Sequence, residues 1–184
     1  MKIVRLSIFI VVALVQLAVP GSVVWHRMQT LKNGRVWKFK TAPVDPVDAF
    51  RGRYVALRFA SEQVPAKEPL ATAWAYAVLK EDENGFATID HLTSARLTGD
   101  DVIRVETTGW WNETQHLHFP FDRYWVTEKD APAAEQAYFT NSRKGNENAY
   151  VTVRVRNGDA AIDQLFLDNQ PLADYLRNFP ASKK

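Results

Sequence analysis

Cysteine is absent from the 184 residues, which excludes disulfide bridges, thiolate metal ligands, cysteine nucleophiles and a lipid-modified N-terminal cysteine. Glycine and proline are few, at eight and nine residues, and follow no period, so collagen-like and repeat architectures are excluded. An excess of one charge is also missing, because 23 basic residues face 21 acidic ones. With 46% hydrophobic residues, the composition excludes a mainly disordered chain and suits one folded domain.

Two N-terminal residues, Lys2 and Arg5, account for the whole basic excess. Residues 6–184 therefore carry 21 basic and 21 acidic side chains. Non-specific binding to nucleic acid depends on neutralising phosphates with basic side chains. We therefore expect no nucleic-acid partner.

A long apolar run from Leu6 to Trp25 follows these two basic residues. Twenty helical residues reach about 30 Å, enough to cross a hydrocarbon core. The run is either an uncleaved anchor or a signal segment cleaved near residues 19–21. We favour the anchor, because Val23 and Val24 prolong the run and Trp25 ends it with an aromatic typical of the membrane interface. The expected parts are a leader over residues 1–25 and one β-rich domain over residues 26–184.

The expected location is the inner (cytoplasmic) membrane, crossed once, with the C-terminal domain outside the cytoplasm. The lipid bilayer would then be a partner of the N-terminal helix. Basic residues after the run do not favour export by a local count: they are Arg27, Lys32, Arg35, Lys38 and Lys40. Long domains nevertheless translocate largely regardless of charge, and a short basic start before an apolar core is how export signals begin.

Alternation with a period of two dominates after Gly34, which predicts strands. The predicted strands cover residues 53–59, 74–78, 86–92, 102–106, 116–121, 151–155 and 162–167. Tight turns are predicted at Asn84-Gly85 and at Asn157-Gly158-Asp159, because Asn-Gly favours the positive φ angles of a hairpin.

Helices are expected to be few and short. Asp130 can cap a helix over residues 131–139, and Pro171 can open another over residues 172–179. The predicted fold is mainly β (α+β), an antiparallel β-sandwich or partly open barrel with one or two short helices, preceded by an N-terminal transmembrane helix.

The most distinctive stretch begins with prolines and acids that can shape a loop. Pro46 forces Asp45 into an extended conformation. Asp45 or Asp48 can cap a short turn, and Arg51 follows Asp48 at a spacing that allows a local ion pair. The stretch is therefore either a structural loop that leads into the next strand or a functional polar patch.

Gly52, Tyr54 and Leu57 then stand at the spacing of a Gly-Asp-Tyr-x-x-Leu-x-Tyr motif. Through this motif the chain resembles the GDYXXLXY family of membrane-anchored bacterial proteins, whose function is uncharacterised. Arg53 replaces the acid of the motif and Phe59 its last tyrosine. The resemblance implies an exported, membrane-tethered domain and brings no known reaction.

The motif loop and strand are the expected contact surface for another membrane or envelope protein. The predicted interaction residues are Pro43, Asp45, Pro46, Asp48, Arg51, Gly52, Arg53, Tyr54, Leu57 and Phe59. A non-enzymatic accessory module is the function that we favour.

No known catalytic motif is found, so we expect no catalytic residue and no cofactor, and we lean away from an enzyme. His116 and His118 would share one face of a strand, as a His-x-His metal site requires. An oxygen ligand could come from Glu113, Asp122 or Glu128. A metal-assisted hydrolase is the least favoured alternative, and a plain polar strand face is the simpler interpretation.

Four aromatic residues could instead stack on a glycan in an envelope ligand-binding module: Trp110, Trp111, Tyr124 and Trp125. Trp110 and Trp111 are expected in a loop. Core packing is the competing role for them, because large aromatic side chains dominate small β cores.

Overall fold

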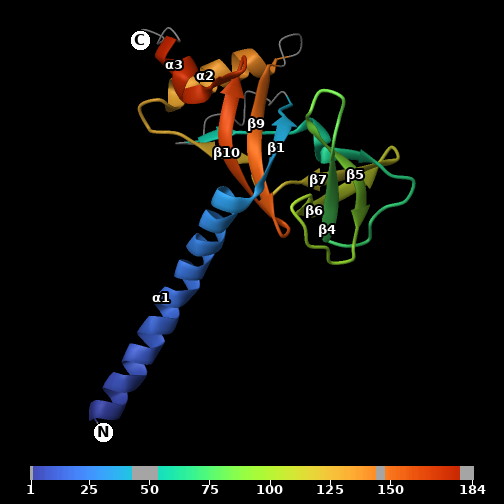
Figure 1. Ribbon diagram of the computed structural model, residues 1–184. Coiled ribbons are helices and arrows are strands. Elements are labelled where there is room, and N and C mark those ends of the chain that lie inside the picture. The colour runs from blue at the N-terminus through green and yellow to red at the C-terminus, as the bar shows by residue number, and fades with distance from the viewer. Residues whose placement is uncertain (1, 43–53, 144–147, 179–184) are drawn as a thin grey trace.

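The computed structural model describes residues 2–42, 54–143 and 148–178. The chain begins with one long helix, α1 (Lys2–Asn33), that projects away from a β-rich body (Figure 1). The fold expected from the sequence, mainly β with short helices after an apolar N-terminal helix, is confirmed.

Three antiparallel sheets form the body. The four-stranded sheet has the order β1–β9–β10–β11, with bounds Arg35–Lys40, Ala149–Arg156, Asp159–Leu167 and Gln170–Pro171. The five-stranded sheet has the order β3–β7–β6–β4–β5, with bounds Gln63–Pro65, Thr114–His118, Val102–Trp111, Trp74–Glu81 and Ala87–Thr93. A short pair joins β2 (Tyr54–Ala56) to β8 (Arg123–Trp125). Together the sheets enclose one core in a partly open, barrel-like wall.

Both predicted Asn-Gly turns are confirmed. Gly85, in the turn between β4 and β5, has φ 77°. Between β9 and β10, Asn157 and Gly158 have φ 52° and 92°, the positive angles of a type I′ hairpin. The valines of β9 at positions 151, 153 and 155 are fully buried, so this hairpin turns its apolar face to the core.

The expectation of a loop at Trp110 and Trp111 is wrong, because both residues belong to β6. β6 and β7 form a third hairpin, whose two turn residues, Asn112 and Glu113, have φ 51° and 55°. Asparagine tolerates these positive φ angles, whereas glutamate rarely adopts them. Asn112-Glu113 therefore matches only the first residue of the usual Asn-Gly turn sequence.

β4 turns its small side chains inward. Ala75 and Ala77 are buried, whereas Trp74 is exposed. Alanines on this face leave room in the core for larger side chains from other elements.

Four phenylalanines from three separate segments meet in the core: Phe39, Phe59, Phe119 and Phe121. Their ring centroids lie 5.0–5.9 Å apart, mostly with edge-to-face geometry. Phe119 and Phe121 follow the end of β7, so the predicted strand over residues 116–121 is shorter than expected.

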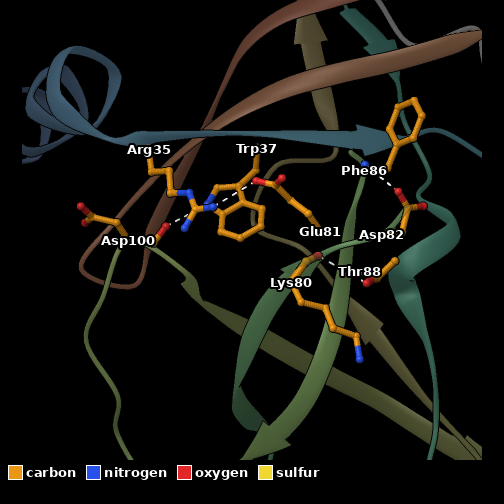
Figure 2. Close-up of polar contacts among 8 residues, drawn as sticks. All are labelled: Arg35, Trp37, Lys80, Glu81, Asp82, Phe86, Thr88 and Asp100. Atoms are coloured by element: carbon orange, nitrogen blue, oxygen red, sulfur yellow. Dashed lines mark hydrogen bonds and ion pairs between the residues drawn. The ribbon is translucent and has the colours of Figure 1, made fainter. Parts of the chain in front are cut away.

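Polar contacts bind β1 to the five-stranded sheet (Figure 2). The Arg35 guanidinium lies 3.0 Å from the Glu81 carboxylate at the end of β4. The Trp37 indole Nε1 donates a hydrogen bond of 2.8 Å to the Asp100 carbonyl, just before β6. β1 is therefore held by β9 along one edge and by the second sheet through its side chains.

The two short helices, α2 (Ala131–Ser142) and α3 (Leu172–Asn178), lie at the end of the body away from α1 (Figure 1). The predicted side-chain cap of Asp130 is wrong: no hydrogen bond runs from its carboxylate to a helix amide. Asp130 has helical backbone angles (φ −90°, ψ −13°) in place of the extended ones typical of an N-cap, and its carboxylate instead accepts a 2.7 Å hydrogen bond from the Thr127 hydroxyl.

α1 runs eight residues beyond Trp25 without a break, and its last turn packs on the β9–β10 hairpin. Thr30 is buried there, and the Gly34 amide donates a hydrogen bond of 2.9 Å to the Thr30 carbonyl. β1 begins at the next residue, Arg35, so only Gly34 separates helix from sheet.

A side chain at position 34 is expected to disrupt this junction. In Gly34→Ala the new Cβ would lie 2.6 Å from the Thr30 carbonyl oxygen and 3.0 Å from that of Val155. We expect a loss of about 1–3 kcal/mol in the free energy of unfolding, measured by denaturation of the detergent-purified protein. Gly21→Ala is the matched control, since its Cβ meets no atom within 4 Å. An equal loss in both variants would contradict this account of the junction.

Candidate functional site

Seven of the ten predicted interaction residues lie outside the described residues: Pro43, Asp45, Pro46, Asp48, Arg51, Gly52 and Arg53. The three that the structure describes, Tyr54, Leu57 and Phe59, divide between surface and core. Leu57 and Phe59 are each 2% exposed and belong to the hydrophobic core. Tyr54 is half-buried on β2.

The predicted strand over residues 53–59 is confirmed as strand only for Tyr54–Ala56. The pattern behind it holds further, because Val55, Leu57 and Phe59 are all buried, as alternation predicts. The Leu57 amide donates to the Asp122 carbonyl at 2.8 Å, which keeps the backbone extended past the end of β2.

Tyr54 forms a small exposed patch with two residues of β8. Its ring contacts that of Trp125 edge-on, with centroids 5.2 Å apart. The Arg123 guanidinium lies 5.0 Å from the Tyr54 ring centroid, within the range of a cation–π contact. Trp125 is 65% exposed, so this patch presents a large indole to solvent. We call Tyr54, Arg123 and Trp125 the motif patch.

The four predicted stacking residues do not form one platform. Tyr124 turns inward, where its hydroxyl hydrogen-bonds with the Leu165 backbone, and burial raises the pKa of this phenol. No ring contact among the described residues joins Tyr124 or Trp125 to Trp110 or Trp111.

Trp110 and Trp111 lie at the end of β6, where neighbouring residues of a strand point to opposite faces of the sheet. Core packing is the wrong role for them, since they are 39% and 51% exposed. Trp110 donates a 2.9 Å hydrogen bond from Nε1 to the Ala66 carbonyl. The Trp111 ring stacks on His116 with centroids 3.4 Å apart, so one of its faces is already covered.

The histidines do share a face of β7, as predicted, but they are used separately. His116 stacks on Trp111, whereas His118 Nε2 lies 3.8 Å from the Asp122 carboxylate. Among the described residues, no three His, Asp or Glu side chains are grouped so that they could hold a metal ion.

A buried acid that was not predicted from the sequence lies beside the motif. Glu62 ends a 3₁₀ turn, η2 (Ala60–Glu62), three residues after Phe59, and is 9% exposed. Its Oε1 is buried without a hydrogen-bond partner. Burial raises the pKa of this carboxyl, and the nearby Arg58 guanidinium opposes that shift. An acid at the edge of a loop carries no local sign of burial, so the sequence offered no signal.

Glu62 also faces groups from two other segments. His118 and Asp122 act on its carboxyl with opposite electrostatic effects. Tyr138 of α2 is close enough to feel the Glu62 charge, and burial raises the pKa of Tyr138 to about 12. Its hydroxyl donates a 3.4 Å hydrogen bond to the Ala42 carbonyl. Burial thus shifts the protonation equilibrium of the Glu62 carboxyl toward its neutral form.

The match to known proteins supports the family suggested by the motif. The family model described as GDYXXLXY protein matches residues 16–165, well over half of the chain. The chain belongs to the GDYXXLXY family. No curated protein and no solved structure matches it.

For this member of the GDYXXLXY family, the structure gives the motif positions physical roles. Leu57 and Phe59 fill the core, while Tyr54 supports an exposed tryptophan. Phe59 stands where the motif has tyrosine, and at 2% exposure a phenol there would need a buried hydrogen-bond partner. Phenylalanine avoids that requirement.

Glu62→Gln is expected to change how stability depends on pH. Because the folded pKa lies above the unfolded one, the carboxyl supports stability below the unfolded pKa and loses that contribution as pH rises through the folded pKa. At pH 7 the variant is expected to melt about 2–4 °C higher than wild type, equivalent to ~1 kcal/mol. This difference in melting temperature between the variant and wild type should disappear as pH falls toward 4.5.

Melting curves between pH 4 and pH 8 test this prediction. Glu83→Gln makes the same chemical change at an exposed position in the β4–β5 turn and serves as the control. If the melting temperature of Glu62→Gln differs from wild type by the same amount at every pH, or if Glu83→Gln shows the same difference, burial of Glu62 is not the cause.

Proposed function

We propose that this protein is a membrane-anchored interaction module that binds another membrane or envelope protein through its motif face. Its domain would lie outside the cytoplasm, tethered to the inner membrane by α1. The proposal is non-enzymatic, and family membership brings no reaction that would argue otherwise.

The observation that carries this proposal is the unbroken course of α1 from the apolar run into the domain. Residues 9–33 form a helix long and apolar enough to cross a membrane, with a mean hydropathy of 1.8 over an 18-residue window. The part of the helix beyond Trp25 is packed on β9 and β10. A domain joined so closely to its anchor is held at a set height above the bilayer, which favours contact with a neighbour in the same membrane.

The motif patch supports the choice of contact surface. Tryptophan, tyrosine and arginine are the residue types that contribute most to binding energy at protein interfaces. The patch contains one of each, and its indole is mostly exposed. The predicted interaction residues 43–53 immediately precede Tyr54 in the chain.

Trp125→Ala is expected to break the interaction. Full-length tagged protein would be purified in mild detergent from its native membrane, and proteins retained at equal stoichiometry would be identified by mass spectrometry. We expect one such membrane protein, with binding by the purified pair weakened at least tenfold in the variant. A triple variant of Asp45, Asp48 and Arg51 to alanine tests the adjoining loop in the same assay.

Trp111→Ala is the matched control, because it removes an exposed indole of similar size from another sheet. Equal binding by all variants would refute the motif face as the contact surface. A protein that purifies alone would count against the interaction module itself. An intact mass lacking residues 1–21 would show that the leader is cleaved and would remove the anchor from the proposal.

A second candidate is an envelope glycan-binding module, favoured by the exposed side chains of Trp110 and Trp111 on the two faces of β6. Sugar rings stack on exposed indole faces, and Trp110 is held in place by its hydrogen bond to Ala66. In this case we expect tryptophan fluorescence to change on titration with cell-wall fragments, and Trp110→Ala to abolish most of the change. A flat titration across the fragment set would argue against this candidate.

A further inference from the structure

A groove lies where α1 meets the β-rich body. It has a volume of about 430 Å³, within the range of about 300–1,000 Å³ common for small-molecule sites. One wall is α1 from Val23 to Thr30, and the other is built from β4, β6, Pro120 and the β9–β10 hairpin. The residues that matter for its chemistry are His26, Arg27, Trp74, Arg104 and Asp159.

The groove is built by backbone contacts between segments far apart in the chain. The Arg104 amide donates a 3.1 Å hydrogen bond to the Gly158 carbonyl, and Ile103 forms an isolated β-bridge with Gly158. These contacts hold the tip of the β9–β10 hairpin against β6. Arg104 is thereby brought to face the helix, and its guanidinium lies 4.3 Å from the Trp74 ring centroid.

The cations of the groove lack ion pairs within the described part of the chain. Neither Arg27 nor Arg104 forms an ion pair with a described residue, and Asp159 is the one acid lining the groove. A second hollow of about 350 Å³ adjoins it and adds Arg156, which donates a 3.4 Å hydrogen bond to Gln29. The residues that line the two hollows thus include three guanidinium groups and one carboxylate.

The position along α1 matches the level of lipid headgroups. His26 and Arg27 directly follow the apolar run that ends at Trp25, whose ring is 62% exposed. Tryptophan is enriched at membrane–water interfaces, and arginine just beyond a spanning segment reaches phosphate groups. Trp74, at 48% exposed, adds a second indole on the domain side of the groove.

From this geometry we infer that the groove binds the headgroup of an anionic phospholipid. Arg27 from the helix and Arg104 from β6 would hold the phosphate, with Trp25 and Trp74 at the interface beside it. Guanidinium groups suit this task, because they stay charged and donate paired hydrogen bonds to phosphate oxygens. The inference rests on the membrane anchor of the proposed function and not on its partner protein.

Lipid retention by the full-length protein tests the inference. The protein would be purified in mild detergent, incubated with equal amounts of phosphatidylglycerol and phosphatidylcholine, and its bound lipids counted by native mass spectrometry. We expect about one phosphatidylglycerol to be retained in preference to phosphatidylcholine. Arg27→Gln and Arg104→Gln are each expected to reduce that preference about fivefold, the equivalent of losing one basic side chain near an anionic surface.

Arg177→Gln in α3 is the matched control, since it removes the same charge at the far end of the body. Equal retention of the two lipids, or the same loss in the control, would overturn the inference. So would retention that falls only when the melting temperature of a variant falls with it. Retained lipid preference with no co-purifying protein would support the groove while counting against the interaction module. A bound partner protein without lipid preference would support the interaction module and count against the groove.

Discussion

The packing of four phenylalanines in the core is the constraint on which the rest of the structure depends. Phe39 comes from β1, Phe59 from the end of the motif, and Phe119 and Phe121 from the segment after β7. All four are buried, and each contacts at least two of the others. Because these segments lie up to 82 positions apart, burying the rings brings the motif, both large sheets and the first strand together.

The motif therefore has two physical parts. Its inward side chains, Leu57 and Phe59, help to close the core, while Tyr54 stands at the surface beside Trp125. Glu62 lies just past the motif, where burial raises the pKa of its carboxyl. A rigid inward half gives the outward half a fixed position, as a recognition surface needs.

Features with a local cause were predictable from the sequence, and features assembled from distant segments were not. The β4–β5 and β9–β10 hairpins follow from alternation and Asn-Gly turns. The β6–β7 hairpin escaped prediction because Asn112-Glu113 lacks glycine. The burial of Glu62 and the groove between Arg27 and Arg104 depend on tertiary packing. The residues next to them in the sequence therefore do not predict them. Tertiary packing also places the predicted stacking residues on separate surfaces, which their positions in the sequence did not predict.

The single residue between α1 and β1 also has a mechanical consequence. A flexible linker would uncouple the orientation of a domain from that of the helix before it. Here Gly34 is wedged against Val155, and the Arg154 guanidinium donates a 3.3 Å hydrogen bond to the Gly34 carbonyl. Turning or tilting the helix would therefore carry the whole β-rich body with it. In the membrane-anchored arrangement that we propose, a neighbour bound to the helix would therefore reorient Trp125 by rotating the helix, so α1 would transmit that rotation to the domain.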